Sequence, residues 1–222
     1  MTTSRNWTQR WAKRLPWLVW LLGVLPLVVF GVSIASNSLG ADPLETLIRG
    51  TGLWALKFLT ATLLVTPLCR LAGWAWLAPS RRHLGLLTFL YALVHLSLYL
   101  GLDQELDAGA IFHDVVKRPF ITLGMTAFIL LLPLALTSTN GMIRRLGGRV
   151  WKRLHRAVYA VAVLAVVHYF VLVKRDVTQP AIYAVAIGVL LGIRVVWAWR
   201  KAAKKVVRRP IPPTAQNLPQ GS

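Results

Sequence analysis

Five histidines are the side chains of this chain best suited to hold a metal or move a proton, and two of them lie in apolar sequence. His95 follows Ala-Leu-Val, and His168 follows Leu-Ala-Val-Val. An ionisable side chain inside a long apolar stretch is costly, so both are candidate functional residues. Imidazole is an axial ligand of haem iron, and the interior of a helix bundle is where such cofactors sit. Two imidazoles on one iron leave no position for a substrate, which favours electron transfer.

The spacing of the histidines relates four of them by depth. His155 precedes His168 by thirteen residues, and His83 precedes His95 by twelve. At about 1.5 Å per residue, His95 and His168 lie at nearly the same depth, about 18–20 Å from the other two. We predict His95, His168 and His155 as haem-iron ligands, with His83 a weaker candidate. Thirteen residues of straight helix rotate a side chain by about 220°, so His155 and His168 do not share a face of a straight helix. Two stacked haems would need a local distortion of the helix or a different approach of haem.

Three other polar groups have weaker functional interpretations. Arg81 and Arg82 could bind a flavin phosphate or a quinone headgroup, or could serve only as positively charged boundary residues. His113 stands beside Asp114 between apolar stretches and is expected to have no cofactor role. Arg194 is expected to extend its charged end toward the lipid headgroups.

Six apolar stretches are long enough, or nearly so, to position these residues across a membrane. Hydrophobic residues make up 56% of the 222-residue chain and charged residues 15%, against about 25% charged in soluble domains. We predict an all-α integral membrane protein: a six-transmembrane-helix bundle over residues 15–199, with haem between the third and fifth helices. Residues 1–14 form a cytoplasmic segment and 200–222 a basic, proline-rich, disordered tail. The stretches are Leu15–Ala35, Thr51–Cys69, Leu84–Leu102, Pro119–Thr137, Ala157–Val173 and Pro180–Trp199.

Charge sorting predicts how the helices are oriented. Twenty of the 26 Lys and Arg residues lie in the N-terminal segment, the connections 70–83 and 138–156, and the region from Arg194 onward. All seven acidic residues lie on the opposite side. Because positive charge stays on the cytoplasmic side, we predict a multi-pass protein of the bacterial inner membrane with both termini cytoplasmic. The net charge of +19 is divided among short clusters between apolar runs, which favours membrane lipid and not nucleic acid as its partner.

Three functions are compatible with intramembrane histidines. The first is a haem subunit that conducts electrons. The second is a transporter with a histidine proton relay and no haem, although no acidic residue lies in any predicted span to assist such a relay. The third is a self-contained oxidoreductase, such as a ferric reductase or an ascorbate-dependent cytochrome. No nicotinamide- or FAD-binding motif is present, so a haem subunit would take electrons from a lipid-soluble quinol or a separate protein.

Several short motifs together resemble the MsrQ family, also called YedZ, within the ferric reductase-like transmembrane group. The similarity runs from about Gly40 to Tyr183. The motifs are Gly40-Ala41-Asp42-Pro43, Ala55-Leu56-Lys57-Phe58, Thr66-Pro67-Leu68, Arg81-Arg82, Leu84-Gly85-Leu86, His95-Leu96, Arg118-Pro119, Thr122-Leu123-Gly124, Leu136-Thr137-Ser138-Thr139, Leu154-His155, Tyr159 and His168-Tyr169.

The resemblance implies a cofactor set and a partner. It implies b-type haem, one or two per chain, and a bound FMN. Electrons would come from the quinone pool or a cytoplasmic flavin reductase and pass to MsrP, a periplasmic molybdopterin protein that itself reduces methionine sulfoxide. The family's histidines correspond here to His95, His155 and His168. Larger oxidase and ferric reductase relatives carry two histidines on each of two helices, whereas here only His83 could accompany His95.

Overall fold

The computed structural model describes residues 3–207, and the side chains of residues 14–203, as helices joined by short turns. Six of its segments are long and apolar enough to span a membrane, which confirms the predicted all-α, six-span bundle within the described residues. The elements are α1 (Thr3–Ala35), α2 (Pro43–Leu71), η1 (Ala75–Leu77), α3 (Ser80–Leu98), η2 (Tyr99–Asp103), α4 (Ala108–Lys117), α5 (Pro119–Leu136), α6 (Asn140–Leu154), η3 (His155–Ala157), α7 (Val158–Leu172) and α8 (Thr178–Val207).

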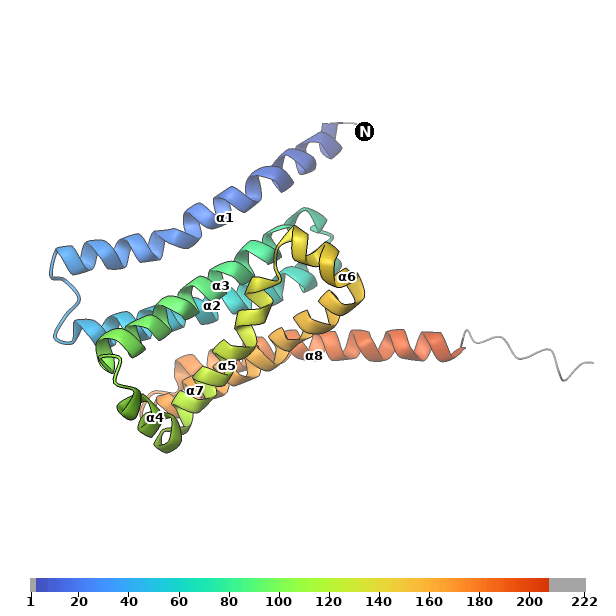
Figure 1. Cartoon of the computed structure of the whole chain (residues 1–222). Helices are drawn as coiled ribbons and strands as arrows, with labels where there is room; N and C mark the ends of the chain where they lie inside the picture. Colours follow the sequence, from blue (N-terminus) through green and yellow to red (C-terminus); the bar gives the residue numbers. More distant parts are fainter. Residues whose placement is uncertain (1–2, 208–222) are drawn as a thin grey trace, which may run out of the picture.

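Two antiparallel helix pairs form the centre of the bundle (Figure 1). The α2–α3 pair and the α5–α7 pair have the most extensive helix contacts, while contacts between the two pairs are fewer. Helix α8 packs on α7 and α2, and α1 packs mainly on α3. The buried core is small and includes Leu59, Leu63, Val161, Ala162 and Ile187. Large apolar side chains on α1 and α8 are exposed, as expected for helices that face lipid.

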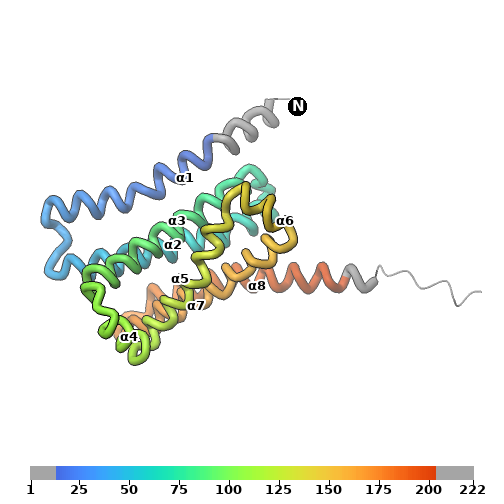
Figure 2. The backbone as a smooth tube through the Cα atoms, viewed as in Figure 1, coloured from blue at the N-terminus to red at the C-terminus, as the bar shows by residue number. Residues whose placement is uncertain are grey.

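The two ends of the bundle, which can be followed in Figure 2, differ in the charged residues of their sequence. The α1–α2 turn, α4 and the α7–α8 turn lie together at one end, which we call the acidic end. Helix α6, η1 and the C-terminal part of α8 lie toward the other, which we call the basic end. Helix α8 continues to Val207, so residues 200–207 of the segment expected to be a disordered tail are helical. Residues 208–222 lie outside the described residues.

Helix α2 begins at Pro43, well before the apolar stretch predicted from Thr51. The Asp42 side chain caps it by accepting a hydrogen bond from the Glu45 backbone N–H at 2.9 Å, and Pro43 suits the first helical turn. Arg49 pairs with Glu45 one turn away. These extra turns are polar on one side, so hydropathy alone did not include them, yet they place Ile48 and Arg49 beside the site described below.

Two segments predicted as connections are helices. The first, α4, is capped by Asp107, which accepts from the backbone N–H groups of Gly109 and Ala110, and its buried Asp114 accepts from the Tyr99 hydroxyl at 3.3 Å. The second, α6, carries exposed arginines and is kinked at Gly147, where φ is +74°. Both have apolar residues on one face only, and they lack the continuous apolar run by which the spanning helices were found.

Candidate functional site

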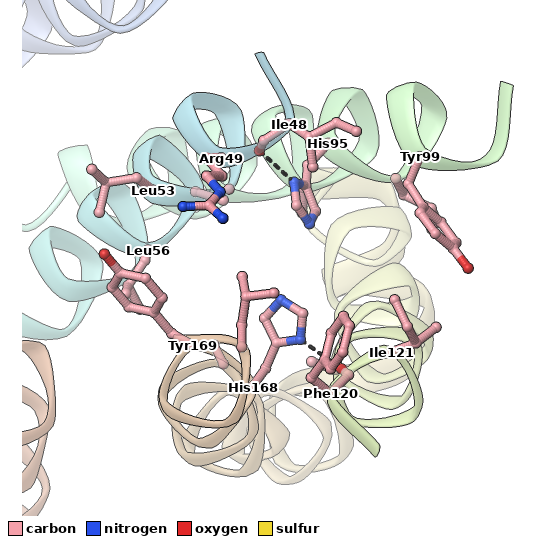
Figure 3. A pocket seen from close by; sticks show the side chains of 18 of the residues that line it. Ile48, Arg49, Leu53, Leu56, His95, Tyr99, Phe120, Ile121, His168 and Tyr169 are labelled. Carbon is pink, nitrogen blue, oxygen red and sulfur yellow. Dashed lines mark hydrogen bonds between the residues drawn. The ribbon is translucent and has the colours of Figure 1, made fainter. Parts of the chain in front are cut away.

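A cavity of about 1430 Å³ separates the α2–α3 pair from the α5–α7 pair. It is larger than the roughly 300–1,000 Å³ of most small-molecule sites. His95 enters it from α3 and His168 from α7, and its inner wall is apolar (Figure 3). Charged residues of the acidic end line its rim. The cavity therefore runs from an apolar interior, where the two histidines lie, to a polar edge.

His95 and His168 face each other, as their predicted common depth requires. Their ring centroids are 6.3 Å apart and their planes are nearly perpendicular, at 82°. His95 Nδ1 lies 2.8 Å from the Ile48 carbonyl oxygen, and His168 Nδ1 lies 2.6 Å from the Phe120 carbonyl oxygen. A carbonyl only accepts hydrogen bonds, so each Nδ1 carries the proton and donates it. Each Nε2 is left with a lone pair, which is the tautomer that a metal ligand needs.

The separation of the rings matches two ligands of one metal ion. A metal–imidazole bond is about 2.0–2.1 Å long and the bonded nitrogen lies about 1.1 Å from the ring centroid, so two opposed imidazoles place their centroids about 6.3 Å apart. Within the described residues, no three His, Cys, Asp or Glu side chains gather around an ion. An ion between these rings would need its other ligands from a bound group, and a porphyrin supplies equatorial nitrogens of that kind. The residues present fit a haem.

The rim of the cavity adds cations next to the apolar interior. Arg49 projects into the space between His95 and Tyr169 (Figure 3), and Lys174 and Arg175 also line the rim. Tyr169 donates from its hydroxyl to Gln179 Oε1 at 3.1 Å. This gradient suits an apolar disc whose carboxylates lie at one edge, which is the shape of haem.

Asp176 gives the rim a fixed negative charge. The side chain and backbone N–H of Thr178 donate to this exposed carboxylate, and these bonds hold the pKa of Asp176 below its usual value. The group is therefore ionised throughout the physiological range. With Asp42, Glu45 and Asp103 it lines the mouth of the cavity alongside the cations.

His155 lies away from this cavity, near the basic end. Its ring stacks on Trp151 with centroids 3.9 Å apart, and Nδ1 donates to the Trp151 carbonyl at 3.1 Å. Nε2 has the free lone pair of a ligand and lies 3.4 Å from Ser138 Oγ. The chain from His155 to Ala157 is a 3₁₀ turn. Such a turn adds about 20° per residue relative to an α-helix, which reduces the offset between His155 and His168 from about 140° to about 80°.

His83 is held differently. Trp20 of α1 donates from Nε1 to His83 Nδ1 at 3.0 Å. An indole N–H can only donate, so Nδ1 is unprotonated and the neutral ring carries its proton on Nε2. This is the opposite tautomer to that of His95 and His168, and it is stabilised by a contact between α1 and α3.

Arg81 and Arg82 differ in their contacts. Arg82 donates from Nη1 to Asn140 Oδ1 at 2.6 Å and so ties α3 to the start of α6, and both arginines are exposed. Arg194 does not extend to the headgroups as expected. It is half-buried and donates to the carbonyls of Leu190 and Leu63, which fastens α8 to α2.

Sequence reasoning missed the groups that hold the two facing histidines. The Ile48 and Phe120 carbonyls are backbone atoms, which every residue possesses, so composition cannot single them out. Arg49 and Tyr169 were passed over because one lay before the predicted span and the other within an apolar run. One available signal was glycine inside an apolar helix, at Gly52 and Gly124.

Comparisons with known proteins agree with this site. Residues 51–166 match the family described as ferric reductase like transmembrane component. A protein-methionine-sulfoxide reductase heme-binding subunit MsrQ of Azospira oryzae is 55% identical over 80% of this chain and 77% of its own length. The proteins of that name from Herminiimonas arsenicoxydans and Xanthomonas oryzae pv. oryzae are each 47% identical, over 84% and 90% of this chain and 87% and 85% of their own lengths. No solved structure matches. The chain thus belongs to the MsrQ family of ferric reductase-like transmembrane proteins.

Proposed function

We propose that this protein is the haem-binding membrane subunit of a methionine sulfoxide reductase system, and that His95 and His168 are the axial ligands of a b-type haem. The observation that carries the proposal is a pair of imidazoles whose ring centroids are 6.3 Å apart. In each ring Nδ1 is held by a backbone carbonyl, which leaves Nε2 available to a bound group between the rings. The names of the relatives support the same assignment.

The ligand set favours electron transfer over substrate chemistry. A haem bound between two imidazoles is low-spin, has no open coordination position, and supplies one-electron redox chemistry. The inner walls of the cavity are apolar, and the two carbonyls orient both rings. The relatives are named as heme-binding subunits, which favours this function over the proton-relay transporter.

The direction of electron flow follows from the proposed orientation of the chain. The basic end faces the cytoplasm of a bacterial cell, with both termini there, and the acidic end faces the periplasm. Electrons enter from the quinone pool or a cytoplasmic flavin reductase, pass through haem, and leave at the acidic end to MsrP, the molybdopterin protein on which methionine sulfoxide is reduced. The cavity rim at the acidic end is the surface through which the donated electron leaves.

A second group of assignments concerns the basic end. His155 is the candidate ligand of an inner haem, since its Nδ1 donates to a carbonyl as those of the outer pair do. Arg81 does not share the Asn140 contact that Arg82 makes, so it is the better placed of the two arginines for an FMN phosphate or a quinone headgroup. Haem is therefore expected at one or two per chain, with the second dependent on His155.

The first test is the dithionite-reduced minus oxidised visible spectrum of the detergent-purified protein. Sharp α and Soret bands of low-spin b-type haem are expected in the wild type and in His113→Ala. His95→Ala and His168→Ala are each expected to lose the contribution of the outer haem to these bands. Normal outer-haem bands in both of the latter variants would remove the ligand assignment. FMN content is measured separately, from the fluorescence of flavin released when the protein is denatured. Arg81→Ala is expected to lower the FMN content. Lys201→Ala, a control at the basic end, should leave it unchanged.

A further inference from the structure

Each of the two facing histidines packs against a glycine of the neighbouring helix. A Cβ added to Gly52 of α2 would lie 3.0 Å from both Nδ1 and Cε1 of His95. A Cβ added to Gly124 of α5 would lie 3.0 Å from Nδ1 and 3.1 Å from Cε1 of His168. Such distances are shorter than ordinary van der Waals contact. The two rings therefore occupy space that is open only because these residues have no side chain.

The glycines also stand at a fixed position relative to the carbonyls that hold the rings. Gly52 follows Ile48 by four residues, and Gly124 follows Phe120 by four residues. Residues four apart lie on one helix face, and a Cβ leans toward the helix N-terminus, over the preceding turn. A side chain at the later position would therefore cover the carbonyl of the earlier one. Glycine leaves that carbonyl open to a histidine approaching from the next helix.

Other helical glycines of the described chain do not contact histidine. Gly23 leaves room for Leu87, and Gly50 leaves room for Phe30, so both serve apolar packing of α1. Gly188 and Gly192 on α8 would have nothing within 4 Å of an added Cβ. The same carbonyl–glycine arrangement thus occurs once in each helix pair, on the only two histidines that line the cavity among the described residues. Two separate occurrences at one spacing point to a shared role.

We propose that Gly52 and Gly124 are positioning residues for the haem ligands, and that each sets how closely its histidine approaches the backbone carbonyl. This inference rests on the proposed ligand roles of His95 and His168. A methyl group at either position pushes the ring outward by a few tenths of an ångström, which lengthens the Nδ1–H···O bond. A weaker bond to the carbonyl makes the imidazole a poorer electron donor to iron. The reduced form is then favoured, so the midpoint potential rises.

The test uses Gly52→Ala and Gly124→Ala in the full-length protein, with Gly188→Ala and Gly192→Ala as controls that make the same change on a helix with open space. Haem per chain, the low-spin ferric EPR spectrum and the midpoint potential are measured in all four. We expect the first two variants to bind haem less tightly, to shift the EPR g values and to raise the potential. The controls should match the wild type, since alanine only increases helix propensity.

Three results separate the possibilities. EPR spectra and potentials of Gly52→Ala and Gly124→Ala identical to wild type would overturn the inference while leaving the ligand assignment intact, provided that His95→Ala and His168→Ala lose the outer haem. Haem retained in those histidine variants would instead remove the proposed function. Loss of helicity or of thermal stability in the haem-free glycine variants, measured by circular dichroism, would also overturn the inference, because it would show a packing role unrelated to the ligands.

Discussion

Histidines near the two ends of the bundle differ in what their ring nitrogens contact. At the cavity, His95 and His168 both donate from Nδ1 to a carbonyl of another helix, and their rings face each other. Toward the basic end, His155 donates to a carbonyl of its own helix and stacks on Trp151, while His83 accepts from Trp20. All four lie on or at the ends of spanning segments. Depth in the membrane alone therefore does not make two histidines a candidate ligand pair. The group that contacts Nδ1 and the group that faces Nε2 also decide it.

The difference has a structural cause. Each cavity histidine is held by a helix pair, in which a neighbouring helix supplies both the carbonyl and the glycine beside it. The other two contact tryptophans: Trp151 stacks on the His155 ring, and Trp20 donates a hydrogen bond to His83. Substitutions that remove one of these contacts at a time test whether the difference between the two ends matters for haem binding.

The largest effect is expected from the cavity pair. His95→Ala combined with His168→Ala removes both ligands of the outer haem, so we expect complete loss of its low-spin EPR signal. Each single variant should lose that signal as well, because one imidazole cannot complete the ligand set. The exposed His113→Ala controls for the chemistry of the change. An outer signal that survived the double substitution would mean that the contrast between the two ends has no bearing on haem.

An intermediate effect is expected at His155. His155→Ala should lower haem per chain, measured by pyridine haemochromogen, by up to half, while the outer haem keeps its EPR signal. Ser138→Ala is a matched control that removes the 3.4 Å contact but not the imidazole, and it should retain the haem. Unchanged haem content in His155→Ala would confine the cofactor to the cavity and leave His155 a structural residue.

A smaller effect is expected at Arg49. Arg49→Gln keeps much of the side-chain length but removes the charge at the cavity rim, so we expect haem to dissociate a few-fold faster into apomyoglobin without loss of the low-spin spectrum. Lys117→Gln, on α4 and outside the cavity lining, provides the control. Equal dissociation rates in the two variants would show that the rim cation at Arg49 does not hold the bound group.

The smallest effect is expected at His83. His83→Ala and Trp20→Phe each remove the hydrogen bond between α1 and α3, which is worth about 0.5–1.5 kcal/mol. Haem content should stay at the wild-type level in both, with a melting temperature only slightly lower. A clear loss of haem in His83→Ala, but not in Trp20→Phe, would identify His83 as a ligand. The histidines of the two ends would then not differ in their role.

The sequence predicted the parts of this architecture that depend on hydropathy and helical rise. Six spans follow from the apolar stretches, and the meeting of His95 with His168 follows from their distances to His83 and His155. It did not predict α4 or α6, because each has one apolar face and too short an apolar run. Nor could it identify Ile48 and Phe120 as partners, since a carbonyl becomes special only through what the fold brings to it. The angular spacing of His155 and His168 left open either a local distortion or a different approach of haem, and it did not predict the 3₁₀ turn over His155–Ala157.

The division of the ligands between two helix pairs bears on how the protein is made. The α2–α3 hairpin leaves the ribosome before α5 and α7, and each hairpin can enter the bilayer with its own backbone hydrogen bonds satisfied. Neither helix pair alone presents two imidazoles to the cavity. If His95 and His168 hold haem as proposed, its capture requires one helix pair to close upon the other, and haem binding then reports complete assembly.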